Sequence, residues 1–428
     1  MNRTEPTVKD FDRIILPVAV RKTIKSTTGV DIPINVVNWG SQPVCKLEMF
    51  WYKDCPSSKE QAVSNVMIKS LREGCRGFTG KDIDFRLDFT GAILGLSSTF
   101  DYNRLTVYGL KEQIAELFPL IFSIISEPTF PEKRIEDIKH IEADNVRIQQ
   151  LRVTYWSDRE LYKMIMGKEN PRALVPDAGD YELVDRDKVL QAFRKEITDV
   201  APEIWVGGKV DDTFIDELSD YVGKLQPKKF IDRPEKDFEV ASYCPEKHIH
   251  SMATASQCAV GLGCPVKVEN VAEYQRLVIA VTALGGFFGS LLNKNIREEK
   301  GLTYGIHSSM LRNPECAFFI VKAQTSAENI DLLVEQTKKE IDQLARQPIN
   351  AELLNAMKQY IMLEIATMVE TPLSATDMLI LQRLRCLPDN YYTTLQTSVK
   401  EATAETILAT AAKYLNSDRL SLSIAGNV

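Results

Sequence analysis

The feature that most constrains the fold of this chain is an internal repeat. Both halves read in the same order: strand, helix, β-hairpin, two long helices and a closing strand. The hairpins are expected at residues 91–110 and 303–324, and the two closing strands carry equivalent glycines, Gly208 and Gly426, which stand 218 residues apart. A period of this length indicates a duplicated module. We therefore predict an α+β fold of two modules of roughly 210 residues, each a mixed or antiparallel sheet with helices packed on it.

The boundary between the modules follows from a change in composition. Residues 224–247 are charged and contain three prolines, which is typical of a linker between domains. We predict a first module over residues 1–225, a linker over 226–247 and a second module over 248–428.

Composition limits the class of partner and the compartment. The formal net charge of -7 and the pI of about 5.5 argue against a nucleic-acid partner. No apolar run approaches the length of a membrane span, and residues 1–17 carry charges where a signal peptide needs an apolar core. We expect a cytoplasmic location, with the periplasm as the alternative if a leader has been removed. The 8 scattered cysteines are interpreted as reduced, mostly buried thiols.

One stretch of the second module, residues 285–309, places two polar groups near each other. An amphipathic helix is expected to end at Gly301, with a short strand from Leu302 to Ile306 after it. Arg297 then lies on the last helical turn and Tyr304 on the strand, so a guanidinium and a phenol could point at the same spot. The alternative is that Arg297 complements the helix dipole and Tyr304 is packing.

The same stretch resembles the second-half signature of the insulinase/pitrilysin-like zinc metallopeptidases, which include the mitochondrial processing peptidases. That signature, Arg-Glu-x-x-Gly-Leu-x-Tyr, stands here at residues 297–304. The segments FPEKRIEDIK (130–139) and WVGGKV (205–210) also match the family. The resemblance implies that the two modules form half of a clamshell. It also implies that Arg297 and Tyr304 hold the substrate backbone and stabilise the tetrahedral intermediate.

The zinc motif of that family is absent from the aligned positions. Active members carry H-x-x-E-H on the first helix, where two histidines bind Zn²⁺ and the glutamate is the general base. The resemblance aligns this motif with Asn65, Ile68 and Lys69, so that asparagine and lysine replace the histidines and isoleucine replaces the base. The distant carboxylate ligand would fall near Asp144 and Asn145. We therefore expect no zinc bound by this chain.

The 4 histidines are an alternative source of chemistry. His248 and His250 could share one face of a strand and chelate a metal, but an exposed linker pair is the simpler interpretation. His140 is expected to be solvated on a charged helix. His307 follows Tyr304 closely and could line the same cleft, with a surface position as the alternative.

Other catalytic patterns are missing. There is no Ser-His-Asp elbow, no phosphate-binding glycine loop and no C-x-x-C site in the sequence. A charged stripe on the helix at 131–150 is expected to face water. Its carboxylates are Glu136, Glu142 and Asp144.

These patterns favour one function and leave two others open. The resemblance implies a metal-free subunit of a two-chain peptidase, with zinc on an H-x-x-E-H paralogue and with Arg297 and Tyr304 reaching the scissile peptide, which would bind by strand addition to a sheet edge. The alternative is a non-catalytic structural or peptide-binding member of the same fold. An autonomous zinc peptidase with unusual ligands is the third hypothesis, and a homodimer is also compatible with the family.

Overall fold

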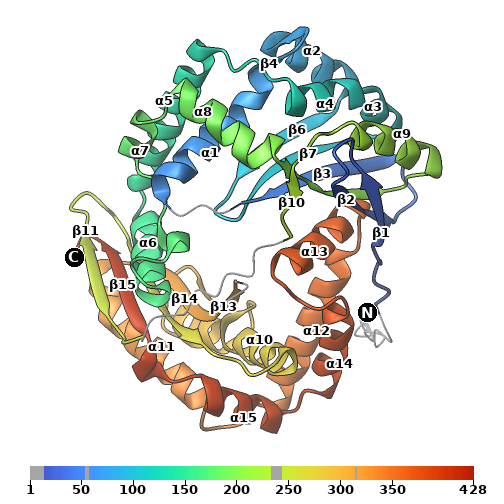
Figure 1. The fold of residues 1–428 in the computed structure, drawn as a ribbon. Helices are drawn as coiled ribbons and strands as arrows, with labels where there is room; N and C mark the ends of the chain where they lie inside the picture. Colours follow the sequence, from blue (N-terminus) through green and yellow to red (C-terminus); the bar gives the residue numbers. More distant parts are fainter. Residues whose placement is uncertain (1–13, 54–56, 233–242, 314–315) are drawn as a thin grey trace, which may run out of the picture.

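A computed structural model describes residues 14–53, 57–232, 243–313 and 316–428. Two α+β modules face each other in it (Figure 1), the first drawn from blue to green and the second from yellow to red. Most of the charged N-terminal segment at 1–17 and the middle of the predicted linker at 226–247 lie outside the described residues. The described part of that linker contains the short strand β10 (Lys229–Phe230), which pairs in parallel with β8 (Val200–Ala201).

Each module contains one large sheet. The first has the strand order β1-β2-β9-β3-β7-β6 and the second the order β11-β15-β12-β14-β13. The strands of the first sheet are β1 (Val20–Lys25), β2 (Asp31–Asn38), β3 (Val44–Tyr52), β6 (Ile93–Ser98), β7 (Tyr102–Leu110) and β9 (Glu203–Gly208). Those of the second are β11 (Lys247–Ser251), β12 (Cys258–Val266), β13 (Ile306–Arg312), β14 (Ala317–Thr325) and β15 (Ser421–Gly426).

The two sheets confirm the predicted duplication. Apart from β1, each strand of the first sheet has a counterpart in the second with the same neighbours and the same direction. The closing strands β9 and β15 run parallel to β2 and β11 and antiparallel to β3 and β12, respectively. Two pairs of glycines repeat as well. Gly91 and Gly301 both have φ of +64° just before the hairpin, and Gly208 and Gly426 have φ of +128° and +151° at the ends of the closing strands.

Both modules contain helices that pack on the sheets. In the first module they are α1 (Ser58–Ser70), α2 (Gly80–Thr90), α3 (Lys111–Glu116), α4 (Phe118–Ser126), α5 (Glu132–Gln150), α6 (Val153–Met166), α7 (Ala178–Glu182), α8 (Arg186–Phe193) and α9 (Asp212–Gly223). In the second they are α10 (Val271–Gly285), α11 (Ile330–Leu344), α12 (Ala351–Met368), α13 (Pro372–Leu384), α14 (Tyr391–Glu401) and α15 (Ala404–Tyr414). None of the helices in the described ranges is both long and apolar enough to cross a membrane.

Strand β3 shows how the sequence sorts its side chains between the two faces. Cys45, Leu47 and Met49 belong to the helix-covered core and are fully buried, as the alternation of a strand requires. Lys46 and Glu48 point to the opposite, inner face, where they form an ion pair of 2.9 Å. The inner face of the first sheet is therefore polar even where it is buried.

Two helices cross from one module to the other. Helix α6 packs on β12 and β15 of the second sheet, while α13 packs on β9, β2 and β3 of the first (Figure 1). Glycines allow these close approaches. A Cβ at Gly261 would lie 3.1 Å from Leu161 Cδ2 of α6, and one at Gly207 would lie only 1.7 Å from Thr376 Oγ1 of α13. Each sheet is thus completed by a helix from the other half of the chain.

Substitution of Gly207 by alanine should loosen this crossing. The added methyl group has no room against Thr376, so we expect a loss of about 1–3 kcal/mol in the free energy of unfolding. Gly179→Ala is the matched control, because Gly179 lies in helix α7 and a Cβ there would meet no atom within 4 Å, so this change should be neutral or slightly stabilising. Urea unfolding of both variants measures the difference, and equal midpoints would contradict the tight crossing.

The thiols follow the expectation only in part. None of the seven cysteines in the described residues forms a disulfide, and Cys45, Cys75, Cys258 and Cys264 are buried. Burial raises the pKa of the Cys45 thiol to about 12, so it is inert as a nucleophile at neutral pH. Cys244 and Cys386, in contrast, are exposed.

Candidate functional site

The positions aligned with the zinc motif lie together on helix α1. The helix begins after Ser57, whose side chain accepts a hydrogen bond from the Glu60 amide. Asn65 and Lys69 lie one turn apart and so share one face, as two metal-binding histidines would. The Asn65 amide donates to the Tyr181 hydroxyl at 2.7 Å and accepts from Gln61 at 2.8 Å.

Lys69 is held by a carboxylate from a second helix. Its Nζ lies 2.6 Å from Glu142 Oε1 of α5, and the Asn145 amide donates to the same oxygen at 3.3 Å. Glu142 is 9% exposed, so the expectation that it faces water is wrong. The charged pattern of α5 alone predicts that Glu142 faces solvent. The residue is buried because Lys69 of α1 neutralises its carboxylate. Asp144, near which the distant ligand was expected, pairs instead with Arg147 on the surface.

This arrangement does not fit a zinc ion. Ile68, in the place of the general base, is fully buried and cannot accept a proton. The Lys69 ammonium lies against the Glu142 carboxylate, where it supplies the positive charge that a metal ion would otherwise bring. Among the described residues, no group of three or more metal-ligating side chains is close enough to hold a metal ion.

Removal of Lys69 tests this ion pair. Lys69→Met should lower the free energy of unfolding by about 1 kcal/mol, a modest value because the lysine side chain is 40% exposed. The second change Glu142→Gln should recover most of that loss, because the carboxylate would no longer be buried without a partner. A double-mutant cycle by urea unfolding measures the coupling, and purely additive effects would contradict the pairing.

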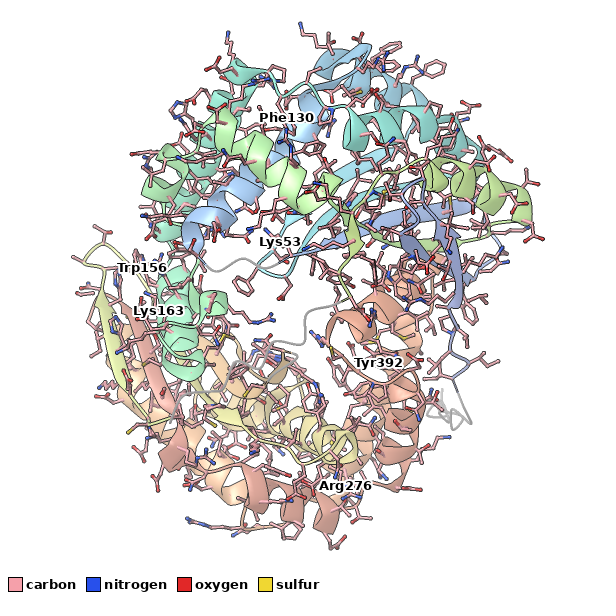
Figure 2. The ribbon with its side chains drawn as sticks, viewed as in Figure 1. Lys53, Phe130, Trp156, Lys163, Arg276 and Tyr392 are labelled. Carbon is pink, nitrogen blue, oxygen red and sulfur yellow. The ribbon has the colours of Figure 1, made fainter. Side chains whose placement is uncertain are left out.

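A buried polar network behind α1 was not found from the sequence. Its centre is Glu196, whose carboxylate accepts hydrogen bonds from Ser64 and Asn103 at 2.8 Å and lies 3.6 Å from Nζ of Lys53, the member of the network that Figure 2 labels. Lys53, Ser64 and Asn103 are each at most 3% exposed. Glu196 lies 132 residues from Ser64 and 93 residues from Asn103 along the chain, so no local spacing reveals the network.

Arg297 lies where the sequence predicted, on the last turn of a helix. Residues Asn293–Glu299 form a π-helical turn, and Gly301 follows in the left-handed conformation. The Arg297 guanidinium lies 4.5 Å from the centre of the Phe288 ring, a cation–π contact. The guanidinium is therefore held against a ring of its own module.

Tyr304 lies in a loop, so the predicted strand over residues 302–306 is wrong. Strand β13 begins only at Ile306. The Thr303 hydroxyl ties the loop down in place of a backbone ladder: it donates to the Gln324 carbonyl at 2.5 Å and accepts from the Gly305 N–H at 3.1 Å. The Tyr304 side chain is 90% exposed as a result.

Tyr304 borders a groove that both modules build. The groove has a volume of about 400 Å³ and is lined by α6, by the ends of β12 and β14 and by the loop at 303–305. Asp158 of α6 and Lys322 of β14 form an ion pair of 2.7 Å across it. His307, a candidate lining residue, stands opposite Lys322 in the register of β13 and β14 and is exposed. Desolvation lowers the pKa of His307, and a hydrogen bond to the Gly285 backbone opposes this shift.

The other histidines lie apart from this groove. His248 and His250 lie on β11, at the outer edge of the second sheet, and His250 stacks on Trp156 of α6 with ring centres 4.0 Å apart (Figure 2). Desolvation and the nearby His248 lower the pKa of His250, which opposes protonation. His140 is 70% exposed on α5, as expected.

Comparison with known proteins points to one family. The family model described as "Peptidase M16 inactive domain" matches residues 184–361. This segment is therefore similar to the insulinase-like M16 peptidases. Two relatives of the chain are named as uncharacterized zinc proteases. The one from Rickettsia bellii is 23% identical over 70% of this chain and 72% of its own length, and the one from Bacillus subtilis is 20% identical over 69% and 72%.

Solved structures share the fold of this chain over nearly its whole length. The M16 inactive domain from Pseudomonas fluorescens has a TM-score of 0.79 at 18% identity and covers 95% of this chain and 98% of its own. A protease from Helicobacter pylori has a TM-score of 0.76 at 11% identity, with 95% and 100% covered. A chain of complex III2 from Candida albicans has a TM-score of 0.73 at 12% identity, with 95% and 96% covered.

Proposed function

We propose that this chain is the Arg/Tyr-bearing, non-zinc-binding subunit of a two-chain M16 peptidase that acts on peptides or small unfolded proteins. The partner would be a paralogue of similar length that carries H-x-x-E-H and the zinc ion. This chain would supply Arg297 and Tyr304 to the shared site. Its own first module would take part in assembly and substrate enclosure.

One observation supports this proposal most strongly. The first half of the chain lacks the zinc-binding residues, whereas the second half has the complete Arg/Tyr signature. On α1 the Asn65–Tyr181 hydrogen bond and the Lys69–Glu142 ion pair take up the groups that a metal site would need. The signature at 297–304, in contrast, is complete, and Tyr304 is almost fully exposed beside an open groove. An exposed phenol next to a groove is suited to a ligand or partner and contributes little to the core of this chain.

The edges of the two sheets offer a way to bind an extended peptide. Strands β6 and β13 are the terminal strands of their sheets at equivalent positions in the two modules. A peptide that adds to such an edge gains backbone hydrogen bonds whatever its sequence, which suits a broad peptide substrate class. Strand β13 begins two residues after Tyr304, so a peptide paired with it would run close to the phenol.

The proposal is tested by isolation of the tagged chain from its own cells, followed by native mass and zinc analysis. We expect a complex of about twice the mass of the single chain, 48.3 kDa, with a second chain that contains H-x-x-E-H and with zinc held by that chain. Recombinant chain alone should show no peptide cleavage, and addition of the partner should restore it. A homodimer or monomer that cleaves peptides without a partner would overturn the proposal.

A purely structural role is the second candidate, and one comparison favours it. A chain of complex III2 from Candida albicans shares this fold over nearly its full length. By that analogy this chain would serve assembly, and Arg297 and Tyr304 would be packing residues or relics. Isolation of the chain in a stable assembly without any H-x-x-E-H chain would support this candidate.

A further inference from the structure

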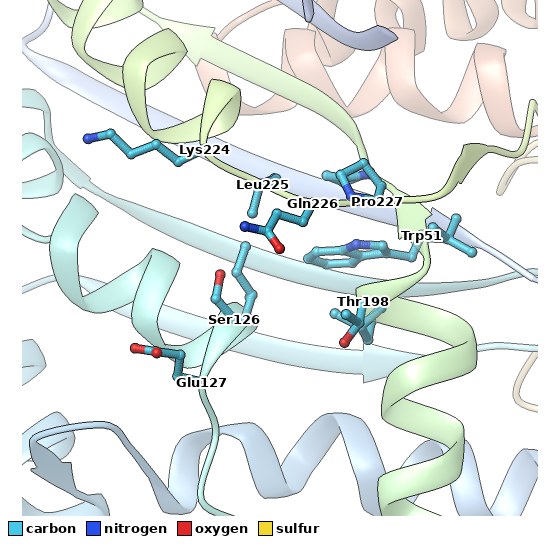
Figure 3. A pocket seen from close by; sticks show the side chains of 12 residues that line it. Trp51, Ser126, Glu127, Thr198, Lys224, Leu225, Gln226 and Pro227 are labelled. Carbon is cyan, nitrogen blue, oxygen red and sulfur yellow. The ribbon is translucent and has the colours of Figure 1, made fainter. Parts of the chain in front are cut away.

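A pocket of about 290 Å³ lies in the first module, on the helix-covered side of the sheet and away from the Tyr304 groove (Figure 3). Its floor is buried and largely apolar, with Trp51, Ile125 and Val200 among the lining residues. Its rim carries the polar side chains of Ser126 and Gln226, which are exposed. This combination of an apolar floor and a few polar groups is typical of a small-ligand site.

The floor offers a hydrogen-bond donor that has no acceptor in the described residues. Trp51 is 1% exposed, and no group in the described residues accepts a hydrogen bond from its indole N–H. Trp39 and Trp156 differ from Trp51 in this respect. The indole N–H of each donates a hydrogen bond to a backbone carbonyl, at 2.9 and 2.8 Å. The indole lines the pocket, so a ligand there can reach this N–H. The pocket therefore suits a ligand that presents an acceptor oxygen to Trp51.

Three helices end at the pocket. The lining includes the last two residues of α4, Ile125 and Ser126, the last two residues of the π-helical extension of α8, Arg194–Thr198, and the first residues after α9. The last carbonyls of a helix lack intrahelical partners, and its C-terminus carries a partial negative charge. Three such ends around one pocket favour a ligand with a positive charge and several N–H donors.

The charged side chains at the rim are engaged elsewhere. Glu127 pairs with Arg76 at 2.9 Å, and the Lys224 ammonium lies over the Tyr221 ring at 4.8 Å from its centre. In Figure 3 the side chains of Lys224 and Glu127 extend away from the Trp51 indole, while the Gln226 amide reaches toward it. The polar character at the centre of the pocket thus comes from the indole, the Gln226 amide and the helix ends.

We propose that this pocket binds a compact apolar amine that carries a carbonyl group next to its ammonium, as in an amino-acid amide or the first residue of a peptide. The carbonyl oxygen would accept the Trp51 N–H, and the ammonium would donate to carbonyls at the helix ends. The apolar side chain would pack against Ile125 and Leu225. This site is separate from the Arg297 and Tyr304 segment, so the proposal does not depend on the proposed peptidase role.

Titration of the full chain with leucinamide, followed by ligand-observed NMR and calorimetry, tests the proposal. For a ligand of this size we expect a Kd on the order of 1 mM. N-acetyl-leucinamide lacks the charge and isoamylamine lacks the carbonyl, so each should bind at least about 10-fold more weakly, as expected for a loss of a charged or buried polar contact. Equal binding of these analogues, or no binding of leucinamide, would overturn the proposal.

Two variants and a control place the binding in this pocket. Trp51→Phe keeps an aromatic floor but loses the donor, and Ser126→Leu fills the rim at an exposed position that should not disturb folding. Both should abolish leucinamide binding in the millimolar range, whereas Trp156→Phe on α6 should leave it unchanged. Unaltered binding to Ser126→Leu would contradict the site.

The tripeptide Leu-Gly-Gly distinguishes the two possible sources of the ligand, a peptide N-terminus and a free amine. Binding as strong as that of leucinamide indicates a peptide N-terminus, and exclusion indicates a free amine.

Discussion

Replacement of Arg297 by alanine, or of Tyr304 by phenylalanine, should lower the turnover of the proposed two-chain peptidase by about 10²-fold, because in that proposal each change removes one donor to the developing oxyanion. The loss should fall mainly on kcat, since such a contact is stronger in the transition state than with bound substrate. Steady-state cleavage of a fluorogenic peptide by the purified complex measures both constants. Native mass spectrometry should show that each variant still assembles.

The Arg297 variant also has a structural consequence that must be separated from catalysis. Its guanidinium packs over the Phe288 ring, so Arg297→Ala should cost about 0.5–1 kcal/mol of stability as well. Arg346→Ala is a suitable control, because Arg346 is an exposed arginine of the same module far along the sequence from the signature. Wild-type turnover in the Arg297 and Tyr304 complexes would exclude a role in the chemistry and favour the structural candidate.

The triple variant Asn65→His, Ile68→Glu, Lys69→His should turn this chain into a zinc-binding protein. The two new histidines would lie one turn apart on the face of α1 that looks toward Glu142, which is freed when Lys69 is removed. We expect about one zinc ion per chain, the occupancy of an M16 site with two histidines and a carboxylate. Zinc content by mass spectrometry measures this directly, and the unmodified chain is the reference.

Stability gives a second measure of the same site. Ile68 is fully buried, so a glutamate there should destabilise the metal-free variant, and zinc should raise its Tm again by mass action. A further change, Glu142→Gln, should weaken zinc binding by at least about 10-fold, because it removes one ligand charge from the site. A folded triple variant without zinc would mean that the aligned positions are wrong and that the ancestral site lay elsewhere.

The duplication could be predicted because both halves need glycine at equivalent backbone positions. Gly91 and Gly301 both occupy a left-handed conformation, and Gly208 and Gly426 both sit where a Cβ would collide with the neighbouring strand. Such positions tolerate few other residues, so their spacing survives where the surrounding side chains differ. The hairpins and long helices followed from periodicity for the same reason: each is a local pattern.

The features that the sequence did not reveal depend on partners far away in the chain. Glu142 is buried because Lys69 faces it, and the sequence of α5 cannot reveal a lysine that comes from α1. Tyr304 is outside the strand because the Thr303 hydroxyl bonds to the Gln324 carbonyl, 21 residues later. The crossing of α6 and α13 was missed as well, since an amphipathic helix shows that it has an apolar face but not which sheet covers it.

The crossing of these helices has a consequence for how such a chain can arise and be divided. Neither module covers its own sheet completely. Helix α13, which packs on the inner side of β9, comes from the second module, and helix α6, which packs on β12, comes from the first. A gene for a single module would encode a protein that is stable only when two copies exchange this helix. The present chain is, in that sense, a tethered dimer. Two separately expressed halves should therefore recover their fold on mixing, by completing each other's sheets.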